Sequence, residues 1–114
     1  MQYALLIYTK PGTVEALSPQ QREALSAEYY ALRDEPGVLG GAALQPVTTA
    51  TTVRLADGKP LVTDGPFAET KEVFGGYYLL EAEDLDQATE LATRIPALRL
   101  GGAIEIRPTM GKVS

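Results

Sequence analysis

The sequence contains no cysteine and no histidine among its 114 residues. The absence of cysteine excludes a disulfide framework, an iron–sulfur cluster, a thiolate metal site and a cysteine nucleophile. The absence of histidine excludes the Ser-His-Asp triad, imidazole acid–base catalysis, histidine-ligated haem and the usual zinc sites. These two absences remove a large share of the known designs for active sites and metal centres.

Positive charge is also scarce, because ten Lys and Arg residues stand against fifteen Asp and Glu, a formal net charge of −5. The basic residues are scattered and form no stripe that would neutralise phosphates, so we predict no nucleic-acid contact. The longest apolar run, YALLIY at residues 3–8, is far shorter than the about 20 residues that a membrane helix needs. No basic segment precedes a longer apolar one at the amino terminus, so we expect a cytoplasmic protein with no membrane contact.

The length and the 45% content of hydrophobic residues predict a single domain over residues 1–114. A chain of this size buries roughly two thirds of its unfolded surface when it folds. We therefore expect a hydrophobic core that needs neither a metal nor a cofactor.

Two helices are predicted from capping signals and hydrophobic spacing. The first begins after Ser18, which forms a capping box with Gln21, and it ends at Pro36-Gly37. Within this helix, Tyr29 is predicted to face the core. The second begins with a capping box from Asp84 to Gln87 and continues to Pro96.

Strands are predicted from β-branched residues, apolar runs and turn signals. Asp57-Gly58 is a strong hairpin turn, and Gly75-Gly76 suggests a β-bulge at the entry to a strand. The predicted strands are residues 2–9, 38–46, 50–56, 59–63, 76–82 and 103–108.

This order of elements is β-α-β, a hairpin insertion and a second β-α-β, the split βαβ or ferredoxin-like arrangement of the α+β class. Two helices can cover one face of a four-stranded sheet, yet the segments 3–8 and 77–80 are apolar on both faces. We expect a second copy of the chain to pack against the open face and form a two-fold homodimer. A cavity between the sheet and the partner, or between the sheet and the insertion, is the expected binding site.

The segment VTDGPFAETKE, residues 62–72, concentrates turn residues and charges between two apolar runs. An Asp in a turn usually accepts a hydrogen bond from the N–H two residues later, but that residue here is Pro66, which has no N–H. The Asp64 carboxylate must therefore accept from Phe67 or Ala68, or point elsewhere. This makes Asp64 a candidate functional carboxylate, and a structural role is an equally open alternative.

The segments GGAALQP, TATTVR, VTDGPFAETKE, GGYYLLEA and GGAIEIRP together resemble the YciI-related (YCII-related) family, and within it the branch with the DGPF motif. The resemblance covers residues 3–108 and implies a dimeric α/β-barrel fold, with Asp64 as the active-site residue. It also implies a regulatory or stress context, because some members are encoded near sigma factors. Two features depart from the family pattern: more distant members pair the Asp with a His, and Ala42 replaces a frequent Glu.

One functional hypothesis is a cofactor-free enzyme that acts on a small cyclic or aromatic molecule. Asp64 would be the general acid or base, and Tyr77 or Tyr78 would donate a hydrogen bond to the substrate. Lys71 or Arg54 would stabilise an anion.

The alternative hypothesis is a non-catalytic module that binds a small molecule or a partner protein such as a sigma factor. Phe67, Glu69 and Glu72 complete the predicted ligand-binding set. The charges of Glu69, Lys71 and Glu72 would take part in recognition or would only form a solvated rim, which is the commoner role of such charges. Oxygen ligands such as Asp64 with Glu69 or Glu72 suit Mg²⁺ or Ca²⁺. Nothing in their spacing requires a metal, and we predict none.

Overall fold

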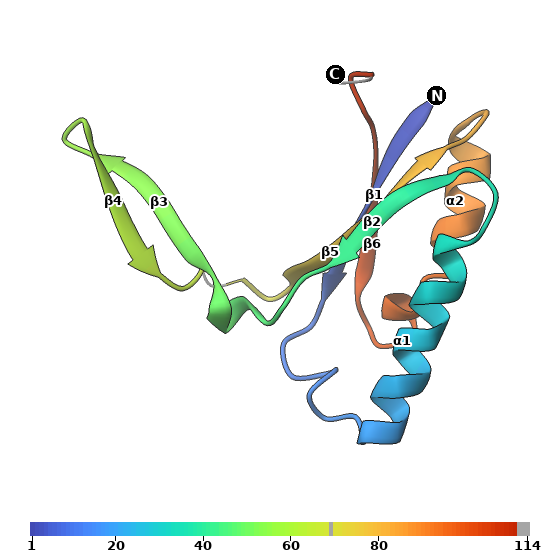
Figure 1. The fold of residues 1–114 in the computed structure, drawn as a ribbon, viewed down its shortest axis with the longest axis horizontal. Helices are drawn as coiled ribbons and strands as arrows, with labels where there is room; N and C mark the ends of the chain where they lie inside the picture. The colour runs from blue at the N-terminus through green and yellow to red at the C-terminus, as the bar shows by residue number, and fades with distance from the viewer. Residues whose placement is uncertain (69, 112–114) are drawn as a thin grey trace.

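The computed structural model describes residues 1–68 and 70–111 and shows a four-stranded antiparallel sheet, backed by helices on one face, with a separate two-stranded hairpin (Figure 1). The order in the larger sheet is β2-β5-β1-β6, which confirms the predicted ferredoxin-like α+β fold. The elements are β1 (Gln2–Thr9), α1 (Pro19–Arg33), β2 (Val38–Ala43), η1 (Val47–Thr49), β3 (Thr51–Ala56), β4 (Lys59–Asp64), β5 (Val73–Glu81), α2 (Leu85–Ala92), η2 (Pro96–Leu98) and β6 (Ala103–Pro108).

Helix α1 begins with the predicted capping box. The Ser18 hydroxyl accepts a hydrogen bond from the Gln21 N–H at 3.1 Å, and the Ser18 N–H donates to the Gln21 side chain at 2.9 Å. Two of the N–H groups that a helix start leaves without partners are satisfied in this way. The helix ends at Arg33, before Pro36, and Gly37 (φ 89°) takes the left-handed backbone that turns the chain into β2.

Helix α2 is shorter than predicted. The Asp84 carboxylate caps the Gln87 N–H at 2.9 Å as expected, but the Gln87 side chain accepts from the Glu83 N–H, so the box is not reciprocal. The helix ends at Ala92 because Ile95, the residue before Pro96, is held in an extended conformation. The prediction that the helix continues to Pro96 was based on the spacing of apolar residues. It did not take into account that the residue before a proline disfavours the helical conformation.

The hairpin β3–β4 forms as predicted, because Asp57 (φ 51°) and Gly58 (φ 79°) both adopt the positive φ angles of a type I′ turn. Strand β2, predicted to reach residue 46, ends at Ala43. The Leu44 N–H still donates to the Gly75 carbonyl at 2.9 Å, and the chain then leaves the sheet towards the hairpin. We call residues 51–64 the arm and residues 44–50 the arm root.

The core lies between the helices and one face of the sheet. It contains Leu5 of β1, Tyr78 of β5 and Ile95 after α2, each below 5% exposed. Tyr29 of α1 packs against this core, as predicted, whereas Tyr30 is exposed.

The other face of the sheet is apolar and uncovered in one chain, as the sequence predicted. Cross-strand neighbours share a face, and the register pairs Leu6 with Tyr77 and Tyr8 with Phe74. The register shifts beside Gly75, which confirms the predicted bulge and brings Phe74 to the same face as Tyr77. We call this surface the open face; its members are Leu6, Tyr8, Phe74, Tyr77 and Leu79.

Two adjacent glycines of β2 provide a matched test of how closely β2 packs against β5. A Cβ on Gly41 would lie 2.3 Å from the Tyr77 carbonyl oxygen, whereas a Cβ on Gly40 would meet nothing within 4 Å. We expect Gly41→Ala to lower the free energy of unfolding by about 1–3 kcal/mol, because β2 must shift away from β5. Gly40→Ala should be neutral or stabilising by up to about 1 kcal/mol. Urea denaturation measures both, and equal effects would contradict the close approach of β2 to β5.

Candidate functional site

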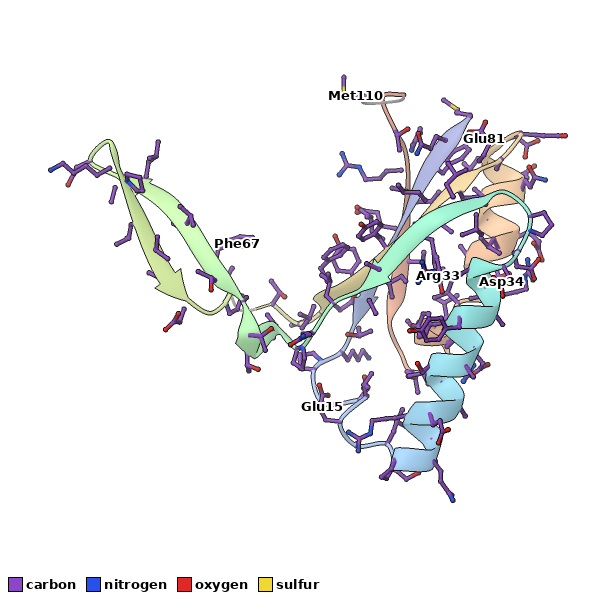
Figure 2. All side chains as sticks on the ribbon, viewed as in Figure 1. Glu15, Arg33, Asp34, Phe67, Glu81 and Met110 are labelled. Atoms are coloured by element: carbon purple, nitrogen blue, oxygen red, sulfur yellow. The ribbon has the colours of Figure 1, made fainter. Side chains whose placement is uncertain are left out.

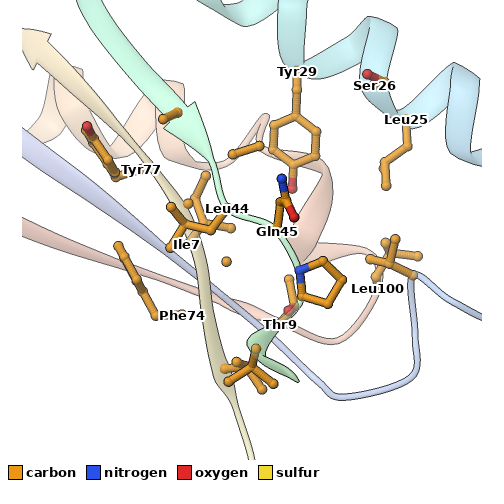
Figure 3. Close-up of a pocket in the computed structure, with 18 of the residues that line it drawn as sticks. Ile7, Thr9, Leu25, Ser26, Tyr29, Leu44, Gln45, Phe74, Tyr77 and Leu100 are labelled. Carbon is orange, nitrogen blue, oxygen red and sulfur yellow. The ribbon is translucent and has the colours of Figure 1, made fainter. Parts of the chain in front are cut away.

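A cleft of about 900 Å³ opens between α1 and the end of the sheet formed by β1, β2 and β5 (Figure 3). The loop after β1 and the arm root, including Leu44 and Pro46, form its other walls. The lining is mainly apolar, with Leu25, Leu44 and Leu100 among its members. A cleft of this size and character is typical of a small-molecule site.

One side of α1 forms a wall of the cleft. Arg22, Ser26, Tyr29 and Arg33 are spaced by four, three and four residues, so they lie along one face of the helix. The Tyr29 side chain points from α1 into the cleft (Figure 3). The helix therefore provides an aromatic ring with a cation on either side of it.

The charge around the cleft differs in sign from that of the whole protein. Lys10, Arg22 and Arg33 line it together with one acidic residue, Glu15, although the formal net charge of the chain is −5. Among residues 1–68 and 70–111, no carboxylate lies within salt-bridge distance of these three cations. Cations gathered at a concave, apolar surface raise the local concentration of anions.

Tyr78, predicted as a catalytic hydrogen-bond donor, is part of the core beneath α1. Its side chain is 4% exposed, and its hydroxyl donates to the Tyr29 backbone carbonyl at 2.6 Å. Burial raises the pKa of the Tyr78 phenol to about 12, and the neighbouring Tyr29 phenol contributes to the rise. Burial also raises the pKa of Tyr29. Both phenols therefore stay neutral near pH 7, and the Tyr78 hydroxyl already has an acceptor.

Asp64 lies at the end of the arm that joins the body and does not line the cleft. It is exposed, and no donor among residues 1–68 and 70–111 is hydrogen-bonded to its carboxylate. The turn after it is held by other groups: the Gly65 N–H donates to the Ala50 carbonyl at 2.7 Å, and the Thr52 hydroxyl donates to the Gly65 carbonyl at 2.7 Å. Of the two options the sequence left for Asp64, the carboxylate points elsewhere and accepts from neither Phe67 nor Ala68.

Arg54 lies on the opposite face of the arm from Asp64. Asp64 pairs with Thr51 and Arg54 pairs with Leu61, and side chains alternate between the two faces along each strand. The Arg54 guanidinium instead donates to the Phe67 carbonyl at 3.2 Å and lies 5.8 Å from the centre of the Phe67 ring. Asp64 and Arg54, which were predicted to act in one site, therefore lie on opposite faces of the arm within one chain.

The remaining predicted residues lie on the segment that returns from the arm to β5. Lys71 is exposed, and the half-buried Glu72 uses its backbone carbonyl to accept from the Thr70 hydroxyl. Glu69 lies outside the described residues. Phe67 is 74% exposed on the arm side of the molecule, well separated from Arg33 of α1 (Figure 2).

One chain thus brings Tyr77 and Tyr78 to the cleft and leaves the predicted residues of the arm and its return segment outside it. The sequence prediction did not include Lys10, Arg22, Arg33 or a ligand role for Tyr29. The spacing of polar and aromatic residues along α1 was the available signal for three of these four.

Two general properties concern the same described residues. In the ranges 1–68 and 70–111, no three His, Cys, Asp or Glu side chains gather as a metal-binding group. Neither described helix has the length and apolar stretch that a bilayer crossing requires.

The sheet order and the two helices on one face define a ferredoxin-like α+β domain. Residues 1–110 match the family model of the YCII-related domain, and the chain belongs to this family. An uncharacterised protein of Rhizobium meliloti (strain 1021) is 38% identical over 95% of this chain and 91% of its own.

Among solved structures, the 5-chloro-2-hydroxyhydroquinone dehydrochlorinase of Burkholderia phenoliruptrix AC1100, in complex with 2,5-dihydroxybenzoquinone, has the same fold. The TM-score is 0.56 at 16% sequence identity, with 98% of this chain and 96% of the other covered. This likeness concerns the fold.

Replacing Tyr78 by Phe tests whether its hydroxyl is structural. We expect Tyr78→Phe to lower the free energy of unfolding by about 1–2 kcal/mol, because the hydrogen bond from the hydroxyl to the partly buried Tyr29 carbonyl is lost. Tyr77→Phe is the matched control on the open face and should change stability by less than about 0.5 kcal/mol. Chemical denaturation of the two variants decides, and equal stabilities would contradict a structural hydroxyl.

The raised pKa of Tyr78 also predicts a pH dependence. Below pH 10 the phenol is protonated in both the folded and the unfolded chain, and its contribution to stability is complete. Between pH 10 and about 12 the unfolded chain releases the proton while the folded chain keeps it, so the free energy of unfolding falls. The fall measured in this window should be smaller in Tyr78→Phe than in the parent protein, and parallel curves would contradict the assignment.

Proposed function

We propose that this YCII-related protein binds a small aromatic molecule with an acidic hydroxyl or carboxylate group in the cleft beside α1. The observation that carries this proposal is the combination of an apolar cleft with three cations that have no carboxylate partner among the described residues. The ring of such a ligand would contact Tyr29 and the leucines of the walls. Its anionic group would accept hydrogen bonds from Arg22 or Arg33, which suit planar oxygen acceptors.

The ligand class agrees with the structural neighbour, whose bound 2,5-dihydroxybenzoquinone is a hydroxylated ring. The cleft of about 900 Å³ has room for a molecule of that size. Within the family, we assign the chain to the branch with the DGPF motif, on the basis of Asp64, Gly65, Pro66 and Phe67.

A second candidate function is turnover of the bound molecule, with Asp64 as the acid or base. The fold supports it, because a protein with this fold is a dehydrochlorinase. In one chain, however, the Asp64 carboxylate is outside the cleft, so binding is the function that the geometry supports best. Catalysis requires that another copy of the chain deliver the carboxylate.

Arg33 provides the test of the binding site. We expect the affinity for 2,5-dihydroxybenzoquinone, measured by isothermal titration calorimetry, to fall about tenfold in Arg33→Gln. That change corresponds to the loss of one charge-assisted hydrogen bond of about 1.4 kcal/mol.

Arg94→Gln is the matched control, because it removes the same charge from an arginine that pairs with Glu35 and Glu90 away from the cleft. Its affinity should equal that of the parent. No measurable binding of the parent at millimolar concentration, or an equal loss in both variants, would refute the proposed site.

A further inference from the structure

The arm extends away from the body of the protein and exposes apolar side chains (Figures 1 and 2). Val53, Leu55 and Val62 are 64%, 75% and 61% exposed. The radius of gyration is 15.9 Å, whereas a compact domain of this length has about 13 Å. An isolated two-stranded hairpin is marginally stable in water, so a long exposed arm requires a surface to pack against.

The exposed apolar residues of the arm are concentrated on one face. Val53 pairs with Val62 and Leu55 pairs with Pro60, so these four side chains lie on the same side of the hairpin. The opposite side carries Arg54 and Lys59, which suit contact with water. We call the side with Val53, Leu55, Pro60 and Val62 the apolar face of the arm.

Asp64 lies on the apolar face, at the end next to the body, because its partner Thr51 is two residues from Val53. No donor among the described residues binds the Asp64 carboxylate, and a carboxylate within a covered surface needs a positive partner. The same chain holds three cations at the cleft, Lys10, Arg22 and Arg33, that lack a carboxylate partner among those residues.

We infer that the apolar face of the arm packs against a second copy of this chain, with Asp64 directed towards the cations of that copy's cleft. Each chain carries two uncovered apolar surfaces, the arm and the open face, together with complementary charges. A two-fold pair supplies both the surface and its complement from the same sequence, because every contact in such a pair is made twice. A different partner would have to cover both surfaces and supply the charges as well.

This inference adds a residue to the site of the proposed function, since the partner's carboxylate would then lie beside the bound molecule. The assembly itself does not depend on any ligand. The packing of the arm can therefore be tested in the absence of a ligand. A negative result would contradict the assembly without contradicting the proposed binding site.

Two leucines on opposite faces of the arm provide the first experiment. Sedimentation equilibrium should show a dimer for the parent and for Leu61→Glu, and a monomer for Leu55→Glu. Both leucines are exposed in one chain, at 48% and 75%, so both variants should keep the circular dichroism spectrum of the parent. The measurement is made at 100 µM, about the concentration at which a dimer with a micromolar Kd is saturated. A monomeric parent at this concentration, or the same assembly in both variants, would overturn the inference.

The absence of cysteine makes a second, direct experiment possible. Asp64→Cys and Arg22→Cys are purified separately, mixed, and treated with a short bismaleimide crosslinker. We expect a covalent pair joined through positions 64 and 22, identified by mass spectrometry of the linked peptides. Arg94→Cys mixed with Asp64→Cys is the control and should give no such link. Linking of position 64 to 94 but not to 22 would overturn the placement of Asp64 at the partner's cleft.

Discussion

Two helices can cover one face of a four-stranded sheet, and this limit shapes most of the molecule. Strands β1 and β5 carry apolar side chains on both faces, so the face away from α1 and α2 keeps Leu6, Tyr8 and Tyr77 partly in contact with water. The bulge at Gly75 adds Phe74 to that surface where a regular strand would have turned it towards the helices. Both faces of the sheet are therefore apolar, and the helices of the same chain cover one of them.

The same division separates the two tyrosines that the sequence places side by side. Tyr78 belongs to the helix side, where its hydroxyl is held by the Tyr29 carbonyl and its pKa is raised by burial. Tyr77 belongs to the open face. On the helix side, the cleft is therefore lined by Tyr29 and the arginines of α1, and the Tyr78 hydroxyl links the sheet to α1.

Local signals in the sequence were sufficient to predict the two α-helices, the six strands and their order. The capping box of Ser18 and Gln21, the turn at Asp57-Gly58 and the bulge at Gly75 depend on neighbouring residues, and all three are present in the structure. The composition of the site was harder to predict, because it depends on how segments meet in space. Asp64 and Tyr78 are fourteen positions apart, yet Tyr78 lines the cleft and Asp64 does not. Arg54 and Asp64 are on opposite faces because of the strand register, which their spacing along the sequence does not reveal.

The arm root has a consequence for how binding would be controlled. Leu44, Pro46 and Val47 are at once a wall of the cleft and the connection to the arm. If these residues move together with the arm, the packing of the arm and the affinity of the cleft are coupled, and such coupling is reciprocal. Whatever holds the arm in place would change the affinity of the cleft, and a molecule in the cleft would change how firmly the arm is held. The amount of the protein in the cell would then help to determine how tightly each copy retains its ligand.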